Sequence, residues 1–290
     1  MDPRLAALCE LLELERLEAN IFRGESRDIG SPQVYGGQVL GQALKAAYGT
    51  VEPDRVAHSL HAYFLRRGDF NAPIVYFVDR ARDGHSFTSR RVTAIQHGEQ
   101  IFNLSASFQV QERGFEHQLV MPQVPAPESL SASTPFTLEK LLPAPAAKRQ
   151  HLLQQRPFEY RVVPPQPAAR RAPGEPSCVW LRTVDRLPPE DLLHRCLLAY
   201  VSDFGLLSAA LEPHRIALQD GAGRGLGLVV ASIDHAMWFH RPVRVDEWLL
   251  YVMDSPSASG ARGFTRGSVF ARDGRLVASA SQEGLIRVTA

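Results

Sequence analysis

Residues 58–67 read HSLHAYFLRR, and residues 233–242 read IDHAMWFHRP. When His61 is aligned with His235, the two segments lie 174 residues apart. The same alignment matches three further pairs: Ala62 with Ala236, Phe64 with Trp238, and Arg67 with Arg241. A repeated segment of this kind predicts that the chain contains two copies of one structural unit.

A second match lies farther along the chain. Phe87-Thr88 matches Phe264-Thr265 at an offset of 264 − 87 = 177 residues. In both copies a turn with glycine and a strand of small residues follow: His97-Gly98 and NLSASFQ in the first, Asp273-Gly274 and VASASQE in the second. We therefore expect the same order of elements in both halves, with a slip of three residues between the two matches.

Each copy is expected to hold a short strand, a helix and four longer strands. One helix is predicted in GGQVLGQALKAA, where apolar residues recur at helical spacing, namely Val39, Leu40, Ala43, Leu44 and Ala47. The other is predicted in PPEDLLHRCLLAYVSD, which opens with proline and acidic residues. The expected strands, rich in β-branched and aromatic residues, are Asn20–Arg23, Leu60–Leu65, Ile74–Arg80, Ser86–Gln96 and Gln100–Val110, then Phe158–Val163, Ser232–Phe239, Trp248–Ser255, Gly263–Ala271 and Leu276–Gln282.

One helix followed by antiparallel strands predicts an α+β fold in which a sheet wraps around a helix. Pairing the edge strands of the two units would join them in one continuous sheet and remove an exposed edge from each. We expect an N-terminal unit at residues 1–115 and a C-terminal unit at residues 158–290. Residues 116–157, rich in proline, are expected to form a linker across the surface, with a short helix somewhere in 138–155.

The composition excludes several classes of protein. With 44% apolar and 22% charged residues the chain is globular, and its net charge of +1 argues against a nucleic-acid partner. Its three cysteines are too few for a disulfide framework, and no Cys/His spacing typical of a metal site occurs. The N-terminal helix carries acidic residues, unlike a signal peptide, and we expect no apolar run long enough to cross a membrane. We expect a cytoplasmic protein without membrane insertion.

Most common catalytic motifs are missing from the sequence, including GxSxG, the Walker A loop, GxGxxG and HExxH. The glycine-rich residues 221–225 match no phosphate-binding spacing and are predicted to form a flexible loop. His58 and His61 are three residues apart on a predicted strand, so we expect them to face opposite ways and not to share a metal ion.

Five segments together resemble the bacterial acyl-CoA thioesterase II family of the TesB type. They are VYGGQ at 34–38, HSLHAYFLRR at 58–67, ASIDHAMWFHR at 231–241, SASGARG at 257–263 and QEG at 282–284. The resemblance implies a double hotdog, which is two tandem units each with an antiparallel sheet around a central helix. It also implies hydrolysis of fatty acyl-CoA to fatty acid and CoA without a metal or organic cofactor. The implied assembly is a homodimer or homotetramer.

In this family an Asp, a Thr and a Gln of the second hotdog hold a water molecule. The resemblance places them at Asp203 in YVSDFG, Ser232 in ASIDH and Gln282 in SQEG. Ser232 departs from the usual Thr, although both residues supply one hydroxyl group. Thioester hydrolysis suits this set, because a carboxylate can take a proton from water while two polar groups orient it.

Two further groups of residues are candidates for binding substrate. Gly36 and Gly37 could offer backbone N–H groups to the thioester oxygen at a helix start. Arg262, with Ser257 and Gly260, would suit a CoA phosphate or pantetheine, because an Arg fork matches phosphate oxygens.

Simpler interpretations of these residues remain open at this point. Asp203 could cap a helix end, Ser232 and Gln282 could be ordinary strand residues, and Arg262 could be a solvated turn residue. His58 could act as a general base, but a structural strand histidine is the simpler interpretation. Two other functions also compete. A hotdog hydratase or dehydratase would need an Asp/His segment that we do not find, and a non-catalytic acyl-CoA-binding protein would not need the Asp/Ser/Gln set.

Overall fold

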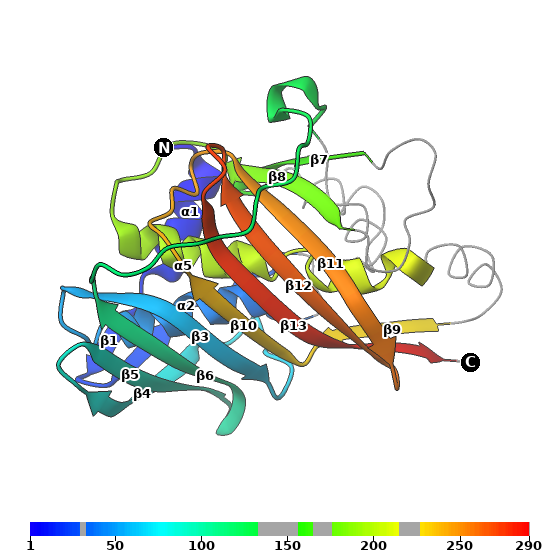
Figure 1. Ribbon diagram of the computed structural model, residues 1–290. Coiled ribbons are helices and arrows are strands. Elements are labelled where there is room, and N and C mark those ends of the chain that lie inside the picture. The colour runs from blue at the N-terminus through cyan, green and yellow to red at the C-terminus, as the bar shows by residue number, and fades with distance from the viewer. Residues whose placement is uncertain (30–32, 133–155, 165–175, 215–226, 290) are drawn as a thin grey trace.

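The computed structural model describes residues 1–29, 33–132, 156–164, 176–214 and 227–289. The helix expected within 138–155 and the loop expected at 221–225 lie outside these residues. In the described part of the chain, a thirteen-stranded antiparallel sheet curves around two adjacent helices (Figure 1).

The helices are α1 (Pro3–Leu12), α2 (Gly36–Tyr48) and α5 (Asp191–Ser202), and short turns η1 (Pro127–Ser129), η2 (Leu207–Ala210) and η3 (Glu212–His214) accompany them. The first half of the sheet holds β1 (Glu15–Glu18), β2 (Ile21–Gly24), β3 (Arg55–Phe64), β4 (Ile74–Asp83), β5 (Phe87–Gln96) and β6 (Glu99–Val110). The second half holds β7 (Phe158–Val162), β8 (Ser177–Thr183), β9 (Gly227–Ser232), β10 (Asp234–Phe239), β11 (Leu249–Ser259), β12 (Arg262–Ala271) and β13 (Leu276–Thr289).

The two halves of the sheet have the same strand order. From the centre outward the first half runs β3-β6-β5-β4-β2-β1, and the second runs β10-β13-β12-β11-β8-β7. β3 pairs with β10, so the sheet is continuous across the middle. The predicted α+β double hotdog is therefore confirmed, while the expected domain boundaries stay a prediction.

The hydrogen-bonded ladders correct the register of the repeat. In the first half, Val92 of β5 pairs with Leu104 of β6, and Leu104 pairs with Ala62 of β3. In the second half, Val269 of β12 pairs with Ala278 of β13, and Ala278 pairs with Phe239 of β10. Phe239 lies 177 residues after Ala62, so β3 and β10 share the offset already seen for Phe87 and Phe264. The 174-residue match of His61 with His235 was wrong, because an odd shift along a strand moves a side chain to the other face.

At the corrected offset a pseudo-twofold axis passes between Leu60 and Met237. These residues pair directly across the β3–β10 seam, and both are fully buried. His61 is exposed on the outer face of the sheet, whereas His235 is buried on the inner face.

Two strand predictions also need correction. The strand equivalent to β2 is β8, which the sequence analysis missed, and the expected strand at Phe158–Val163 is β7, the counterpart of β1. The single strand expected over Ser232–Phe239 is broken at Ile233 into β9 and β10, and both pieces pair with the long strand β13.

The central helices pack against each other in antiparallel directions. All five apolar residues predicted for the stripe of α2 are buried, and because the sheet wraps around the helix its polar Gln38 and Gln42 are buried too. A fully buried leucine such as Leu40 contributes about 1.5–3 kcal/mol to the free energy of unfolding. α2 starts close to the end of α5, where the Tyr35 hydroxyl donates to the Tyr200 carbonyl at 2.9 Å.

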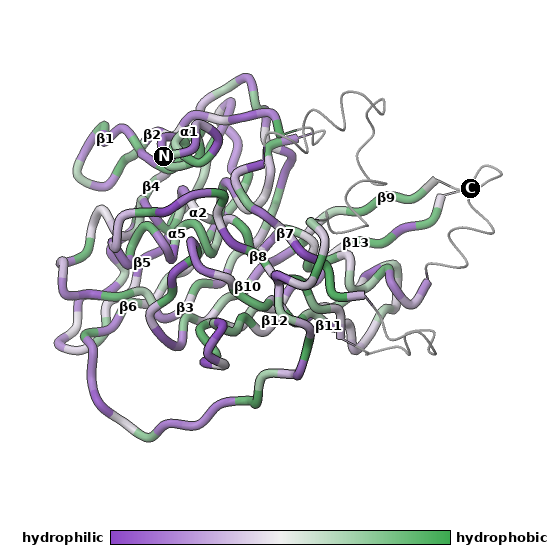
Figure 2. The backbone as a smooth tube through the Cα atoms, turned by 90° about the horizontal axis from the view of Figure 1, so that it is seen from above, coloured by the Kyte–Doolittle hydropathy of each residue, from purple (hydrophilic) through white to green (hydrophobic). Residues whose placement is uncertain are grey.

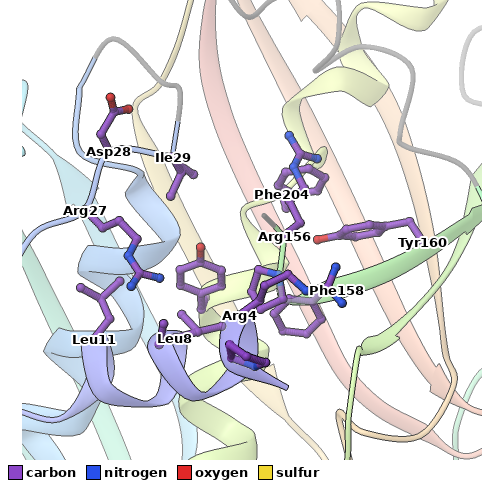
Figure 3. A pocket seen from close by; sticks show the side chains of 14 residues that line it. Arg4, Leu8, Leu11, Arg27, Asp28, Ile29, Arg156, Phe158, Tyr160 and Phe204 are labelled. Carbon is purple, nitrogen blue, oxygen red and sulfur yellow. The ribbon is translucent and has the colours of Figure 1, made fainter. Parts of the chain in front are cut away.

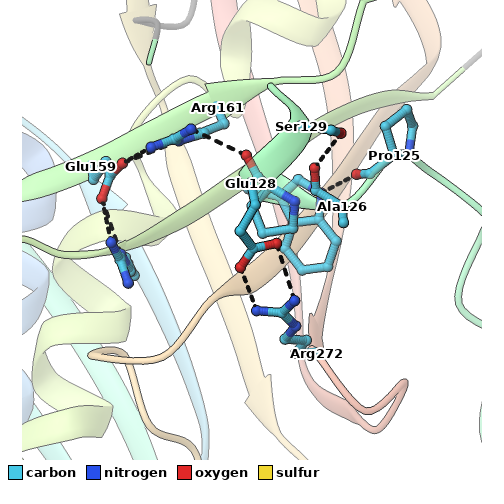
Figure 4. Close-up of polar contacts among 10 residues, drawn as sticks. Pro125, Ala126, Glu128, Ser129, Glu159, Arg161 and Arg272 are labelled. Carbon is cyan, nitrogen blue, oxygen red and sulfur yellow. Dashed lines mark hydrogen bonds and ion pairs between the residues drawn. The ribbon is translucent and has the colours of Figure 1, made fainter. Parts of the chain in front are cut away.

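Residues 111–132 cross the outer face of the second half, opposite the helices (Figures 1 and 2). Figure 4 shows their anchor around η1, where Arg272 forms two hydrogen bonds to Glu128 at 2.6 and 3.0 Å. Nearby the Trp180 indole donates to the Pro125 carbonyl at 2.9 Å. Residues 116–132 of the expected linker thus lie on the surface, while the linker itself, like the domain boundaries, stays a prediction.

The segment Asp191–His214 is long and apolar enough to cross a membrane, judged by length and composition alone. We had expected no such segment from the sequence. Its most apolar window is 72% buried inside the protein. Packing of α5 in the core accounts for this apolar character.

We predict that Gly37→Ala destabilises the fold, because a Cβ atom there would lie 2.0 Å from the Tyr200 carbonyl oxygen and force the helices apart. Overpacking of this kind costs about 1–3 kcal/mol. Urea unfolding should show the loss, while the control Gly114→Ala, with no atom near its new Cβ, should change stability by less than about 1 kcal/mol. Equal stability of the two variants would contradict the close helix contact.

Candidate active site

Three elements bring Asp203, Ser232 and Gln282 together. Asp203 directly follows α5, which stops there because Gly205 adopts a left-handed conformation with φ of 82°. Ser232 is the last residue of β9, next to the break at Ile233. Gln282 faces inward from the middle of β13, and the Thr265 hydroxyl of β12 holds its backbone carbonyl at 3.0 Å.

The three side chains are within hydrogen-bonding reach of one another. The Gln282 Nε2 atom donates to Asp203 Oδ1 at 2.6 Å and lies 3.1 Å from Ser232 Oγ. The Ser232 hydroxyl is 3.5 Å from the same carboxylate oxygen. The sequence resemblance therefore selected residues that the fold places in one cluster.

Burial and hydrogen bonding shift the pKa of Asp203 in opposite directions. Burial of the carboxylate raises its pKa above the ordinary value, and hydrogen bonds from Gln282, the Gly37 backbone N–H and Ser232 act in the other direction. The start of α2 adds a partial positive charge close to the carboxylate. Asp203 thus has a raised pKa, and the same hydrogen bonds hold its carboxylate in place when it is charged.

Gly36 and Gly37 lie where α2 meets Asp203. A Cβ atom on Gly36 would come within 2.8 Å of Asp203 Oδ2 and of the Phe64 ring, so only glycine allows this approach. The N–H of Gly37 already serves the Asp203 carboxylate. The expectation that these glycines bind the thioester oxygen stays a prediction, and Gly36 is the better placed of the two to fulfil it.

A small cavity of about 70 Å³ opens beside the cluster, lined by Asp203, Ser232, Gly36, Phe64 and several neighbouring residues. One water molecule needs about 30 Å³ of space. The Oε1 atom of Gln282 is buried and has no hydrogen-bond partner in the described residues. The cavity therefore has room for a water molecule, and the cluster contains one acceptor atom, Gln282 Oε1, that has no donor in the part of the chain that the structure describes.

The sequence analysis missed two residues that extend this cluster. His235 Nδ1 is 3.4 Å from Gln282 Nε2, and His235 Nε2 is 3.0 Å from the Ser202 hydroxyl. Burial lowers the pKa of His235 to about 3, so its ring is neutral. The incorrect register hid this residue, because it matched His235 with the exposed His61.

The other predicted substrate residues lie away from the cluster. Ser257, Gly260 and Arg262 belong to the β11–β12 hairpin, where Gly260 and Ala261 form the turn with φ of 56° and 59°. Arg262 pairs with Glu283 at 2.9 Å. Since Glu283 and Gln282 are consecutive in a strand, Arg262 lies on the outer face and the cluster on the inner face.

The expectation that His58 and His61 face opposite ways was wrong. A bulge in β3 between Ala57 and Ser59 turns His58 outward, where its Nε2 contacts the Ser107 hydroxyl at 2.8 Å. His61 is also exposed on this face, against the Trp238 ring. Neither histidine contacts the cluster, and no group of three metal-ligating side chains occurs in the described ranges.

A wider cavity of about 520 Å³ lies between α1, the end of α5 and β7 (Figure 3). Aromatic rings line it, with Tyr160 stacked on Phe204 at 4.9 Å between ring centres, and Arg156 lies over Phe204. Its rim also carries Arg4 and Arg27. Phe204 directly follows Asp203 in the chain, although none of the three cluster residues lines this cavity.

The first half of the chain does not repeat this cluster. The residue equivalent to Gln282, 174 positions earlier on β6, is Phe108, which is fully buried and packs against Tyr48 at 4.9 Å between ring centres. The 177-residue offset matches His235 with His58, but His58 is the extra residue of the bulge and faces outward, so that Ala57 lies opposite Phe108. The cluster is therefore specific to the second half.

Comparison with known proteins agrees with this site. A family model described as acyl-CoA thioesterase matches residues 151–285, and a model of the acyl-CoA thioesterase N-terminal domain matches residues 23–109. The chain is 42% identical to acyl-CoA thioesterase 2 of Haemophilus influenzae over 289 residues, which cover 99% of both proteins. The chain belongs to the acyl-CoA thioesterase family. This membership makes it a thioester hydrolase of the thioesterase II type.

Solved structures support the assignment. The acyl-CoA thioesterase II TesB2 of Mycobacterium marinum superimposes with a TM-score of 0.80 at 43% identity, covering 98% of this chain and 99% of that one. A protein with a hot dog fold from Alicyclobacillus acidocaldarius, at 19% identity and a TM-score of 0.75 over 98% of this chain and 99% of its own, shares the fold.

We predict opposite effects of Asp203→Asn on activity and stability. The folded pKa of Asp203 is raised, so the protonated carboxyl favours the folded state, and that stabilisation is lost as pH rises through the folded pKa. Asparagine is always neutral. The variant should therefore lose activity, while its melting temperature at neutral pH equals or exceeds that of the unchanged protein, by a margin that shrinks as the pH falls through the raised folded pKa and is gone below the ordinary carboxyl pKa of 3.8.

Calorimetry at several pH values measures this margin. A variant that is less stable at neutral pH and gains stability relative to the unchanged protein in acid would contradict a raised pKa of Asp203.

Proposed function

We propose that this enzyme hydrolyses fatty acyl-CoA to a free fatty acid and CoA with a water molecule activated by Asp203, Ser232 and Gln282. The observation that carries the proposal is the hydrogen-bonded contact of the Asp203 carboxyl group with a buried amide and a hydroxyl beside a water-sized cavity. In the reaction one water oxygen joins the acyl carbon, and the thiolate of CoA leaves and takes up a proton.

Asp203 is the general base in this mechanism. As the water attacks, its proton moves to a carboxylate oxygen, and the raised pKa makes that transfer easier at neutral pH. Ser232 and the unpartnered Gln282 Oε1 orient the water. Positioning of this kind converts an encounter with solvent into a reaction between groups already in place.

The thioester oxygen becomes negatively charged in the transition state. The start of α2 lies next to Asp203, so the backbone N–H of Gly36 is the candidate donor for that oxygen. The wider cavity, lined by aromatic rings that include Phe204 and by arginine side chains, provides space for part of the substrate. No step of this mechanism needs a metal ion or an organic cofactor.

We also propose that the enzyme is a cytoplasmic homodimer or homotetramer. Support comes from the outer face of the sheet, where Tyr63, Phe87, Trp238 and Phe264 are between 37% and 53% exposed. Exposed aromatic residues of this kind often mark a contact surface. Sedimentation measurements on the purified protein test this assembly.

Two alternatives predict different products. A hydratase would change the absorbance of enoyl-CoA and release no CoA, and a binding protein would bind acyl-CoA without turnover. Measurement of free thiol across a series of acyl chain lengths distinguishes hydrolysis from both.

We predict that Asp203→Asn lowers kcat for CoA release by about 10²–10⁴, because positioned acid–base groups contribute that much to rate. Ser232→Ala and Gln282→Ala should each cost less, and Ser232→Thr should remain near the unchanged rate. His58→Gln is the control and should retain most activity. Loss of activity in folded His58→Gln together with normal turnover by Asp203→Asn would replace this mechanism with a histidine base.

We predict that Arg262→Ala raises KM for acyl-CoA more than it lowers kcat, because a phosphate contact binds ground and transition states about equally. A short acyl-pantetheine substrate without nucleotide phosphates should be almost unaffected. Arg266 on the same strand pairs with Asp254 at 2.8 Å, so Arg266→Ala is the matched control. Equal losses with both substrates would mean that Arg262 is structural.

A further inference from the structure

The buried His235 on β10 contacts the proposed water-binding cluster without reaching the cavity. It connects two groups: Ser202, near the end of α5, and Gln282, on β13. All three side chains are at least 99% buried. Their hydrogen bonds therefore form without competition from bulk solvent.

The hydrogen bonds determine which nitrogen of His235 carries the proton. The Ser202 hydroxyl donates its only proton to the Ala199 carbonyl at 2.9 Å, so toward His235 it can only accept. Nε2 of His235 must then be the donor to Ser202. Nδ1 is left with a lone pair 3.4 Å from Gln282 Nε2, whose first proton goes to Asp203 and whose second is shared between Nδ1 and the Ser232 hydroxyl oxygen at 3.1 Å.

This acceptor matters because an amide side chain has two orientations of similar shape. While Asp203 is charged, its carboxylate holds the Gln282 amide with Nε2 toward it. Once Asp203 has taken a proton from water, its hydroxyl could donate to a reversed Gln282, whose Oε1 would then face it. Reversal would also turn Oε1 toward His235 Nδ1, so that two acceptors would face each other.

We propose that His235 is a positioning residue, whose Nδ1 keeps the Gln282 amide in one orientation whether or not Asp203 carries a proton. This inference rests on the proposed function of Asp203 and Gln282. Burial supports it, since it lowers the pKa of His235 to about 3 and so keeps Nδ1 an acceptor at working pH.

The first half of the chain provides an internal comparison. There Phe108 occupies the position of Gln282, and no amide needs to be oriented. The histidine at the 177-residue offset, His58, is turned to the outer face by the bulge in β3, and the buried Ala57 lies opposite Phe108. An inward histidine thus accompanies the glutamine in the second half, and both are missing in the first.

The test compares His235→Asn, which can still present an acceptor at the position of Nδ1, with His235→Gln, whose amide reaches only the position of Nε2. We expect kcat to fall about 10- to 100-fold in His235→Gln, the cost typical of removing a group that orients a functional side chain, with little change in KM. His235→Asn should recover much of that loss. His240→Gln, the same substitution at a histidine that contacts Ser279 on the outer face, away from the cluster, is the matched control.

A second readout needs no substrate. In His235→Gln a reversed Gln282 accepts from the protonated Asp203 and stabilises it, so the pKa of Asp203 should rise, and His235→Asn should restore it. Carboxyl ¹³C NMR, with Asp203→Asn identifying the signal, measures this pKa. Other titratable or charged groups near Asp203 are Tyr35 and Tyr251, both of which burial keeps protonated, and Arg66, which is paired with Glu99 at 3.0 Å.

Ser202→Ala tests the same chain of hydrogen bonds without changing the histidine. It removes the acceptor that keeps the proton on Nε2, so the pKa of Asp203 should rise here as well. The inference is overturned if His235→Gln and His235→Asn are equally impaired, or if neither His235→Gln nor Ser202→Ala raises the pKa of Asp203. If the protein released no CoA at all, the proposed function would fail, and the NMR titration would still decide the role of His235.

Discussion

The rest of the structure depends on a backbone contact between the two central helices. Gly37 lies so close to the Tyr200 carbonyl that a single added carbon would be 2.0 Å from it. The contact lets the start of α2 meet the end of α5. Asp203, at the end of one helix, thereby lies in front of the N–H groups that begin the other, and a charged carboxylate can persist there despite burial.

The sheet supplies the remaining groups of the site. β13 is long enough to pair with both β9 and β10, and the break between those two strands lies beside Gln282. Ser232 ends one piece and His235 lies in the other. The irregular point of the sheet therefore holds the proposed chemistry, whereas the same region of the first half is filled by Phe108 and Tyr48. Two similar units have produced one site.

Much of this arrangement could be predicted from the sequence. The 177-residue match of Phe87 with Phe264 indicated the tandem units, helical spacing located α2, and an opening proline with acidic residues located α5. The match of His61 with His235 gave the wrong register for β3 and β10, because sequence similarity does not show which face of a strand a residue occupies. β8 was missed since it follows a segment without clear periodicity, and the bulge at His58 leaves no mark in the sequence.

The site was predictable only in part. The resemblance selected Asp203, Ser232 and Gln282, which are distant in sequence, but spacing alone could not show that they touch. Arg262 was expected to bind a CoA phosphate or pantetheine, and strand alternation places it on the face of the sheet opposite the cluster, where that role stays a prediction. Second-sphere contacts such as Ser202 with His235 depend on packing in three dimensions, and no local pattern indicates them.

The central claim is that water attacks the thioester directly, with Asp203 as base and not as nucleophile. Single-turnover hydrolysis with enzyme in excess, carried out in H₂¹⁸O, tests it most directly. The account predicts that the released fatty acid carries ¹⁸O from the first turnover and that the peptide containing Asp203 carries none. Label in that peptide, with unlabelled fatty acid, would show an acyl-enzyme anhydride on Asp203 and contradict the account.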